Sequence, residues 1–276
     1  MPLTIDRSPR QSLASLAQAQ PWDVLVVGGG ATGLGVALEA QLRGLKVLLI
    51  EARDFASGSS SRSTKLLHGG VRYLAQGQWA LVREALRERA TVLSLAPHLA
   101  QPLRFCVPLD GPWSLLRMGL GLGLYQAMAG RHRLGDLRWL DAAQTARGLP
   151  PDVPAARGGL QYWDGQFEDA RLALALARSA HVQGASLRNH TRLSALQPQE
   201  GLWRARLDDG LNGQSQEVLA RCVVQATGVW VDELRSLWSQ AGAGPGPAQP
   251  PWVRVSQGVH LVIPQARLPL QQALLV

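Results

Sequence analysis

One stretch of polar and small residues, SRSTKLLHGGVRYL at positions 61–74, holds the side chains best suited to chemistry. Histidine exchanges a proton near neutral pH and arginine pairs with anions, so both types suit a binding or catalytic site. Adjacent glycines cost a helix roughly 1 kcal/mol each relative to alanine, so they indicate a close approach of the backbone to another group. We therefore expect a polar pocket built from Ser61, Ser63, Lys65, His68, Gly69, Gly70, Arg72 and Tyr73.

A glycine-rich turn near the N-terminus is the first element able to position a ligand. DVLVVG at 23–28 is a continuous apolar run, typical of a strand buried on both faces. A helical pattern follows over 31–43, and its N-terminus offers free N–H groups and a positive dipole end to a phosphate. In this strand–turn–helix context the GxGxxG pattern indicates a dinucleotide site. The residues of the turn are Gly28, Gly30, Ala31, Thr32 and Gly33.

A carboxylate completes this βαβ unit. KVLLIE at 46–51 is a second buried apolar run, and Glu51 ends it. A carboxylate at this place can accept hydrogen bonds from both ribose hydroxyls of an adenosine. The order of strand, turn, helix, strand and acid predicts a bound dinucleotide, but it does not distinguish NAD from FAD.

A later strand end gives a second signal. VVQATG at 223–228 is an apolar strand that ends in small residues and precedes a helical pattern. Small residues let a strand end approach a cofactor, although an ordinary strand-to-helix turn explains the glycine equally well. The segment resembles the second FAD-contacting segment of flavoproteins with two dinucleotide-fold motifs. Its candidate contacts are Ala226, Thr227 and Gly228.

Other elements are predicted from periodicity and capping. An amphipathic helix is expected over 77–95, with its charged residues, Arg89 among them, largely on solvated faces. Further helices are predicted at 141–149, with Asp141 as the N-cap, and at 167–185 and 228–238. Strands are predicted at 104–109, 158–165, 186–196, 201–209, 217–228 and 253–264.

Composition limits the class of protein. The chain has 276 residues, 46% of them hydrophobic, which is enough for one large domain or two smaller ones. Its formal charge is +8, but the arginines are scattered and no nucleic-acid module is present, so no nucleic-acid partner is expected. Cys106 and Cys222 lie in apolar runs and are expected to be reduced core thiols of a cytoplasmic protein. The segment 113–130 is predicted to be a buried or interfacial helix, and no metal site is predicted.

Together these motifs resemble one known family. The segments DVLVVGGGATGLGVALEAQLRGLKVLLIE, SSSRSTKLLHGGVRYL, EDARL and VVQATGVWV are similar to those of FAD-dependent glycerol-3-phosphate dehydrogenases. The resemblance runs from about residue 22 to the end, and S-S-x-x-S-x-K-L-x-H-G-G-x-R-Y-L is its most specific part. It implies that sn-glycerol 3-phosphate is oxidised to dihydroxyacetone phosphate, with FAD as the cofactor and a membrane quinone as the electron acceptor.

The resemblance also implies roles for single residues. His68 is expected to act as the base, Arg72 to pair with the substrate phosphate, and Tyr73 to donate a hydrogen bond to the substrate. Contacts with FAD are expected from Gly28, Gly30, Ala31, Thr32, Gly33, Glu51, Ser59, Ser60, Ser61, Ser63, Lys65, Gly69, Gly70, Ala226, Thr227 and Gly228. Gly69 and Gly70 are expected to lie against the flavin ring.

The implied fold class is α/β. A Rossmann-like FAD-binding domain of the glutathione-reductase-2 type is expected from 20–96 and 155–240, after a flexible leader at 1–19 in which a short helix can form. An α+β substrate domain, interleaved with it, is expected from 97–154 and 241–276. Because members of this family continue well beyond the point that corresponds to Val276, the chain is expected to be truncated, with an incomplete substrate domain.

The expected surroundings are the cytoplasm and the inner face of the cytoplasmic membrane, where the protein would bind peripherally, with a homodimer as a further expectation. Two alternatives remain open. One is another FAD-dependent oxidase of the same superfamily, acting on glycerol 3-phosphate with oxygen or on amines or 2-hydroxy acids. The other is a non-catalytic FAD-binding fragment.

Overall fold

The computed structural model describes residues 12–17, 20–150, 156–240, 242, 250–270 and 272–275. The chain forms two compact units. The first unit combines Met1–Arg62 with Asp169–Gln257, and the second combines Ser63–Glu168 with Gly258–Val276. Each unit has its own sheet and its own hydrophobic core, so each is described separately below.

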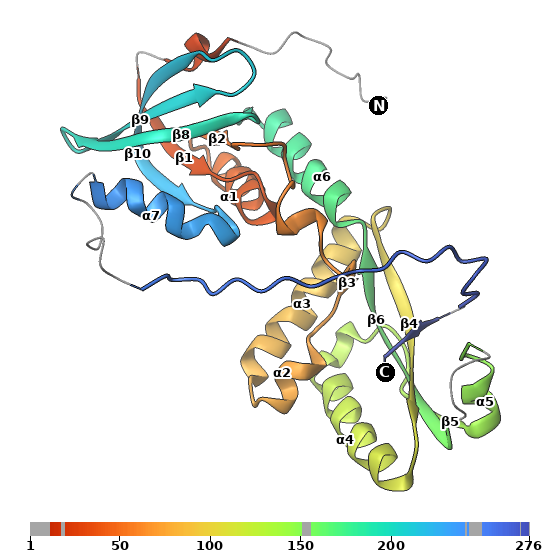
Figure 1. Ribbon diagram of the computed structural model, residues 1–276. Coiled ribbons are helices and arrows are strands. Elements are labelled where there is room, and N and C mark those ends of the chain that lie inside the picture. Colours follow the sequence, from red (N-terminus) through yellow and green to blue (C-terminus); the bar gives the residue numbers. More distant parts are fainter. Residues whose placement is uncertain are drawn as a thin grey trace. The chain divides into compact units, whose positions relative to one another are not determined.

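The first unit is built on a six-stranded sheet with the order β7-β2-β1-β10-β9-β8 (Figure 1). Its β10, β1, β2 and β7 run parallel, whereas β8, β9 and β10 pair in antiparallel fashion. The strands are β1 Trp22–Val27, β2 Val47–Ile50, β7 Ser186–Arg188, β8 Thr191–Gln199, β9 Leu202–Asp209 and β10 Ser215–Gln225. The predicted βαβ unit is therefore present, and its two strands lie side by side.

Helices α1 (Ala31–Leu42) and α6 (Asp169–Val182) pack against one face of this sheet and against each other. The contact is lined largely by alanines, which allow two helices to approach closely. The buried set on this face includes Val24 and Val26 of β1 together with Ala37, Ala40, Ala173, Ala177 and Ala180. The opposite face buries Leu25 and Val27, which explains why β1 reads as a continuous apolar run.

Part of the predicted flexible leader is packed. Residues 1–11 and 18–19 lie outside the described residues, but Leu13–Leu16 form the short 3-10 helix η1. Leu13 and Leu16 are buried in the core of the first unit. The indole Nε1 of Trp22 donates a hydrogen bond to the Leu16 carbonyl at 3.2 Å. The leader thus contains a short helix, and this helix is packed rather than flexible because its two leucines cover the sheet.

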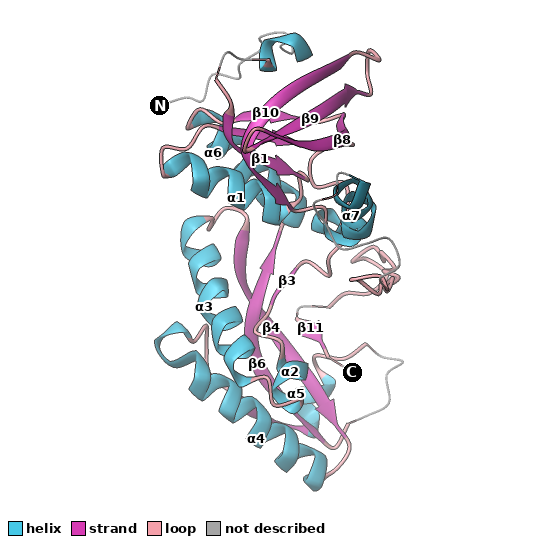
Figure 2. Ribbon diagram, turned by 90° about the vertical axis from the view of Figure 1, so that its left-hand side faces the viewer, coloured by secondary structure: helices cyan, strands magenta, loops and turns pink. Residues whose placement is uncertain are grey.

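The second unit is built on the long antiparallel pair β4 (Ala100–Leu109) and β6 (Gly158–Phe167). Figure 2 shows α3 and α4 along the same side of this pair. The other strands are β3 Leu66–Leu67, β5 Arg138–Asp141 and β11 Ala273–Leu274, and the helices are α2 Val71–Ala75, α3 Trp79–Leu95, α4 Pro112–Ala129 and α5 Ala142–Ala146. Asp141 caps α5 as predicted, since its Oδ1 accepts the Gln144 N–H at 2.7 Å.

The boundaries of the units differ from those of the predicted domains. The sequence pattern assigns 63–96 and 155–168 to the cofactor domain, whereas the structure packs 63–96 and 158–168 within the second unit. The reason is the pairing of β6 with β4 and β3, which ties both segments to one sheet. Periodicity identifies β6 as a strand but carries no information on its partners.

The predicted strand at 253–264 is wrong. The structure describes these residues as an exposed segment without strand pairing. The amides of Trp252 and Val253 instead donate to the Asp232 carboxylate at 3.0 and 3.3 Å, which anchors the start of the segment to α7 (Val231–Gln240). An alternating apolar pattern becomes a strand only where a neighbouring backbone pairs with it, and among the described residues none does.

The two cysteine thiols differ in their exposure to solvent. Cys106 is buried in β4, as predicted, and burial raises the pKa of its thiol. Cys222 is exposed on β10, so its assignment to the core is wrong. Its neighbour Arg221 is also exposed, whereas Val218 and Ala220 earlier in the strand are buried. Among the helices in the described ranges, none has the length and apolarity that crossing a bilayer requires.

Candidate functional site

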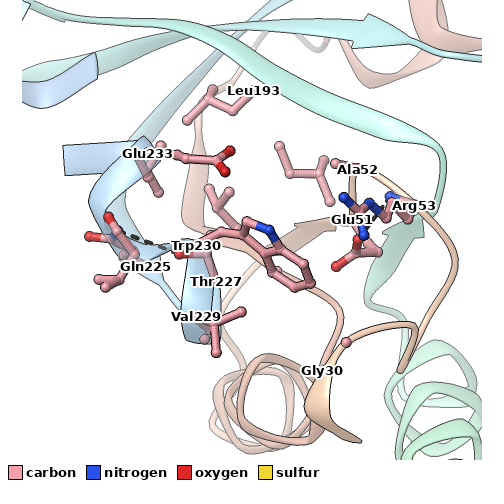
Figure 3. Close-up of a pocket in the computed structure, with 18 of the residues that line it drawn as sticks. Gly30, Glu51, Ala52, Arg53, Leu193, Gln225, Thr227, Val229, Trp230 and Glu233 are labelled. Carbon is pink, nitrogen blue, oxygen red and sulfur yellow. Dashed lines mark hydrogen bonds between the residues drawn. The ribbon is translucent and has the colours of Figure 1, made fainter. Parts of the chain in front are cut away.

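A pocket of about 690 Å³ lies in the first unit, where β1, β2 and β10 end (Figure 3). Ligands of open α/β sheets bind at the carboxyl ends of parallel strands, so this is the expected place for a cofactor. Ten of the residues predicted to contact FAD line the pocket: Gly28, Gly30, Ala31, Thr32, Glu51, Ser59, Ser60, Ala226, Thr227 and Gly228. They come from three separate parts of the chain, which the sheet brings together.

Two glycines of the turn are required because a side chain at either position would clash with the backbone. Gly28 has φ +117°, and a Cβ there would lie 2.4 Å from the Ala226 carbonyl oxygen. A Cβ on Gly33 would lie 1.9 Å from the Gly28 carbonyl oxygen. The start of α1, the end of β1 and the end of β10 therefore meet backbone to backbone, and this contact forms the floor on which a pyrophosphate can approach the chain.

Ser60 reaches the N-terminus of α1. Its Oγ accepts the Ala31 N–H at 2.9 Å, and a Cβ on Gly30 would lie 3.1 Å from the same oxygen. A helix N-terminus attracts anionic groups through its free N–H groups and its dipole. The serine hydroxyl and the first turn of α1 thus present donors at one place on the pocket wall.

Glu51 is held at the end of β2 by the backbone around it. Its Oε2 accepts the Gly29 N–H at 2.7 Å, and its Oε1 accepts the Arg53 N–H at 2.8 Å. Each carboxylate oxygen keeps a further lone pair for another donor. The carboxylate is therefore oriented before any ligand arrives, and it lines the pocket as the adenosine interpretation requires.

Trp230 and Arg53 are pocket residues that the sequence interpretation missed. Trp230 lies between Arg53 and Gln225 in Figure 3, with the Arg53 guanidinium 4.8 Å from the indole centroid. A Cβ on Gly58 would lie 2.9 Å from the indole, so this glycine makes room for Trp230. The available signal was a tryptophan two positions after the Ala-Thr-Gly strand end.

A glycine, two serines and a lysine predicted near the cofactor do not line the pocket, and the structure gives them other contacts. Gly33 packs below the turn, and Ser61 ends η2 (Ser59–Ser61), where its hydroxyl donates to the Gly58 carbonyl at 3.4 Å. Ser63 and Lys65 belong to the second unit, and the Ser63 Oγ accepts the Lys65 N–H at 3.0 Å. Their contact with FAD remains a prediction.

The candidate substrate residues lie in the second unit. His68 is exposed, Arg72 lies in α2, and Tyr73 is 43% exposed. The structure brings these three residues together on one short turn and helix, β3 to α2. The cofactor pocket is described within the first unit, so their contact with a bound flavin remains a prediction.

Contacts within the second unit explain why residues 69 and 70 are both glycines. A Cβ on Gly69 would lie 2.6 Å from the Tyr125 hydroxyl and 2.7 Å from Leu86. Gly70 has φ +72°, and a Cβ there would lie 2.5 Å from the Tyr73 ring. Contact with a flavin ring is thus not required to explain the two glycines, although the predicted contact is untested.

A buried polar cluster lies behind these glycines. Arg89 Nη1 donates to Asp164 Oδ1 at 2.8 Å, and the Tyr125 hydroxyl donates to Asp164 Oδ2 at 2.8 Å. The expectation that Arg89 is solvated is wrong, because only 3% of it is exposed. Burial raises the pKa of the Asp164 carboxyl, while the Arg89 guanidinium and the Tyr125 hydroxyl act in the opposite direction. Burial likewise raises the pKa of Tyr125, so its phenol stays protonated.

Comparison with known proteins agrees with this geometry. A family model described as FAD dependent oxidoreductase matches residues 23–275. A relative named mitochondrial glycerol-3-phosphate dehydrogenase, from Rattus norvegicus, is 39% identical over 98% of this chain and 39% of its own length. A glycerol-3-phosphate dehydrogenase of Mycobacterium leprae is 42% identical over 94% of this chain and 44% of its own.

A solved structure gives the same result. The glycerol-3-phosphate dehydrogenase of Bacillus halodurans, crystallised with FAD, superposes with a TM-score of 0.62 and is 31% identical. The match covers 81% of this chain and 37% of that protein. This chain thus spans about two fifths of the length of the curated relatives it matches.

Proposed function

Because the chain belongs to the FAD dependent oxidoreductases, we propose that its first unit binds FAD and that the protein oxidises sn-glycerol 3-phosphate to dihydroxyacetone phosphate. The observation that carries the proposal is the contact of Gly28, Gly33 and Ala226, with the Glu51 carboxylate beside it. A side chain at either glycine would clash with the backbone that forms the floor of the pocket, so the residues present fit a dinucleotide. The substrate class is supported by the glycerol-3-phosphate dehydrogenases among the relatives.

The second unit is proposed to supply the substrate contacts. When bound, FAD accepts a hydride from the substrate carbon. In this proposal the His68 imidazole takes the hydroxyl proton, the Arg72 guanidinium pairs with the phosphate, and the Tyr73 hydroxyl donates to a substrate oxygen. All three lie between β3 and the end of α2, so a single short segment would bind and activate the substrate.

Flavin reduction by the substrate tests this function directly. We expect the full chain, loaded with FAD and kept without oxygen, to lose its flavin absorbance when glycerol 3-phosphate is added. Arg72→Met should lower kcat/KM by about 10- to 100-fold, because a hydrogen bond to a charged group contributes roughly 1.5–3 kcal/mol. Arg87→Met, at an exposed position of α3, is the matched control and should have no effect.

The other outcomes separate the alternatives. If the protein takes up FAD but glycerol 3-phosphate does not reduce it, the protein is a non-catalytic FAD-binding protein. If an amine or a 2-hydroxy acid reduces the flavin instead, the protein is a different oxidase of the superfamily. Faster turnover with oxygen than with a quinone would indicate a glycerol-3-phosphate oxidase. A protein that takes up no FAD would contradict the proposal from its first step.

A quinone acceptor and a peripheral position on the inner face of the cytoplasmic membrane complete the proposal. The outer face of α4 supports the membrane contact, because apolar residues spaced by three and four positions are exposed there. These are Trp113 at 81%, Leu116 at 48%, Leu120 at 68% and Leu124 at 38%. The quinone and the homodimer are proposed from the resemblance alone.

Binding to lipid vesicles tests the membrane contact. We expect the protein to sediment with anionic vesicles, and Leu120→Glu to weaken its partitioning about tenfold or more, because burying a leucine contributes roughly 1.5–3 kcal/mol. Leu174→Glu, at a leucine that is 50% exposed on α6, is the control. Equal loss in the two variants would mean that α4 is not the contact.

A further inference from the structure

The amide of Gly69 is the end of a buried chain of hydrogen bonds in the second unit. It donates to the Tyr125 hydroxyl at 2.7 Å, and that hydroxyl donates to Asp164 Oδ2 at 2.8 Å. Arg89 holds the other carboxylate oxygen through Nη1 at 2.8 Å, and its Nη2 donates to the His132 carbonyl at 3.0 Å. Four parts of the chain therefore meet behind the turn that carries His68.

The direction of each bond in the chain is determined by chemistry. A backbone N–H can only donate, so the Tyr125 oxygen must accept from Gly69. The single proton of the phenol is then free to point at Asp164, whose second oxygen already accepts from Arg89. The Asp164 carboxylate accepts on both oxygens, and the Tyr125 phenol both accepts and donates. The hydrogen bonds of the cluster can therefore run in only one set of directions.

This buried cluster is expected to add little to the free energy of unfolding. The exposed fractions are 3% for Arg89, 1% for Asp164 and 2% for Tyr125, and taking an ion pair out of water offsets much of its attraction. Among the described residues the Arg89 Nε, which is also buried, has no hydrogen-bond partner. A pair of this kind is better suited to holding one conformation than to adding free energy.

The conformation it holds is that of the turn from β3 to α2. β3 has only two residues and α2 only five, so few backbone hydrogen bonds of regular structure constrain the segment between them. Gly70 adopts the left-handed conformation at the start of α2, and its carbonyl accepts the Tyr73 N–H at 2.9 Å. The bond from Gly69 to Tyr125 attaches this turn to the second unit's core.

We infer that Tyr125, oriented by Asp164 and Arg89, is a positioning residue that holds the Gly69 amide and thereby sets where His68 and Arg72 stand for the oxidation. The inference rests on the proposed function for the reaction that these residues serve. Tyr125 is not proposed to touch the substrate. It acts through the backbone of the turn, and a displacement of about 1 Å at a reacting group can cost about 100-fold in rate.

Tyr125→Phe is the test, because it removes one hydroxyl and keeps the ring that packs against Leu86 and Ala129. The matched control is Tyr162→Phe. Tyr162 is also buried in the second unit, 6.5 Å from Tyr125 between ring centroids, and its hydroxyl forms no hydrogen bond with the described residues. A second control, Leu122→Ala, loosens α4 without removing a hydrogen bond of the cluster.

The expected result separates positioning from folding. In the FAD-loaded protein, Tyr125→Phe should slow flavin reduction by glycerol 3-phosphate about 10- to 100-fold, with FAD content unchanged. Amide hydrogen exchange at residues 68–70 should speed up in this variant. Tyr162→Phe should stay within about twofold of the wild type in both measurements. Asp164→Asn keeps an amide oxygen that can still accept from Tyr125, so its loss of rate should be smaller. Because it also removes the counter-charge of the buried Arg89, its rate is compared at equal stability with that of Leu122→Ala.

Two results would overturn the inference. One is an unchanged reduction rate in Tyr125→Phe together with unchanged exchange at residues 68–70. The other is a loss of rate in Tyr125→Phe no larger than in an equally destabilised Leu122→Ala. If glycerol 3-phosphate does not reduce the flavin of the wild-type protein, the proposed function is contradicted. Amide hydrogen exchange at residues 68–70 in Tyr125→Phe then still decides whether Tyr125 holds the turn.

Discussion

Replacing Gly33 with alanine is expected to yield a protein that neither retains nor takes up FAD. The new Cβ would stand 1.9 Å from the Gly28 carbonyl oxygen and 3.3 Å from the Ala226 Cβ. Neither neighbour is a flexible side-chain end, so α1 must move away from β1 and β10. Overpacking of this kind costs about 1–3 kcal/mol of unfolding free energy, and it also opens the floor on which the pyrophosphate approaches.

Gly35 offers a control within the same helix. A Cβ on Gly35 would meet nothing within 4 Å, so Gly35→Ala introduces the same methyl group without a clash. Alanine is favoured over glycine in a helix by about 1 kcal/mol, and we expect this variant to bind FAD and to be slightly more stable. The measurements are flavin absorbance per mole of purified protein and urea unfolding. Full flavin content in Gly33→Ala would show that the contact of α1 with the turn is not needed for binding.

Removing the charge of Arg89 is expected to have the largest effect on stability. Arg89→Met leaves the Asp164 carboxylate 1% exposed and without its counter-charge. Breaking a buried pair from one side costs about 3–5 kcal/mol. Arg43→Met provides the comparison, since Arg43 pairs with Glu39 at 2.6 Å on the surface of α1. An exposed i,i+4 pair contributes about 0.5 kcal/mol or less, so this variant should unfold at nearly the same urea concentration as the wild type.

The loss in Arg89→Met should grow as the pH rises. The pKa of Asp164 is already raised above its ordinary value of 3.8 by burial, and Arg89 opposes that rise. Without Arg89 the pKa rises further, so the native state binds more protons than the unfolded state over a wider range above pH 3.8. Stability falls with pH wherever the native state binds the extra proton, so the destabilisation at pH 8 should exceed that at pH 5. Urea unfolding at both values checks this, and an equal loss at the two values would mean that Asp164 is not the group responsible.

Arg89 also shows where sequence reasoning reaches its limit. Its neighbours on α3 include Arg87 and Glu88, both exposed, so local periodicity correctly places most of this charge run in water. The partner that buries Arg89 lies 75 positions later in β6. Nothing in the helix pattern encodes that distance. The prediction for Cys222 fails for a related reason, because an apolar run does not say which of its side chains the folded sheet leaves exposed.

The sequence by itself determined the dinucleotide unit. Its apolar runs, glycines and Glu51 act over short distances, and steric limits on a backbone turn admit few residues other than glycine, so the pattern is legible without a structure. The tertiary structure decided the rest. Pairing of β10 with β1 brings Ala226 onto the turn. Pairing of β6 with β3 and β4, together with the packing of α3 and α4, places Asp164 and Tyr125 behind Gly69. Such contacts join segments far apart in the chain, and their free energy depends on burial and geometry that exist only once the sheets have formed.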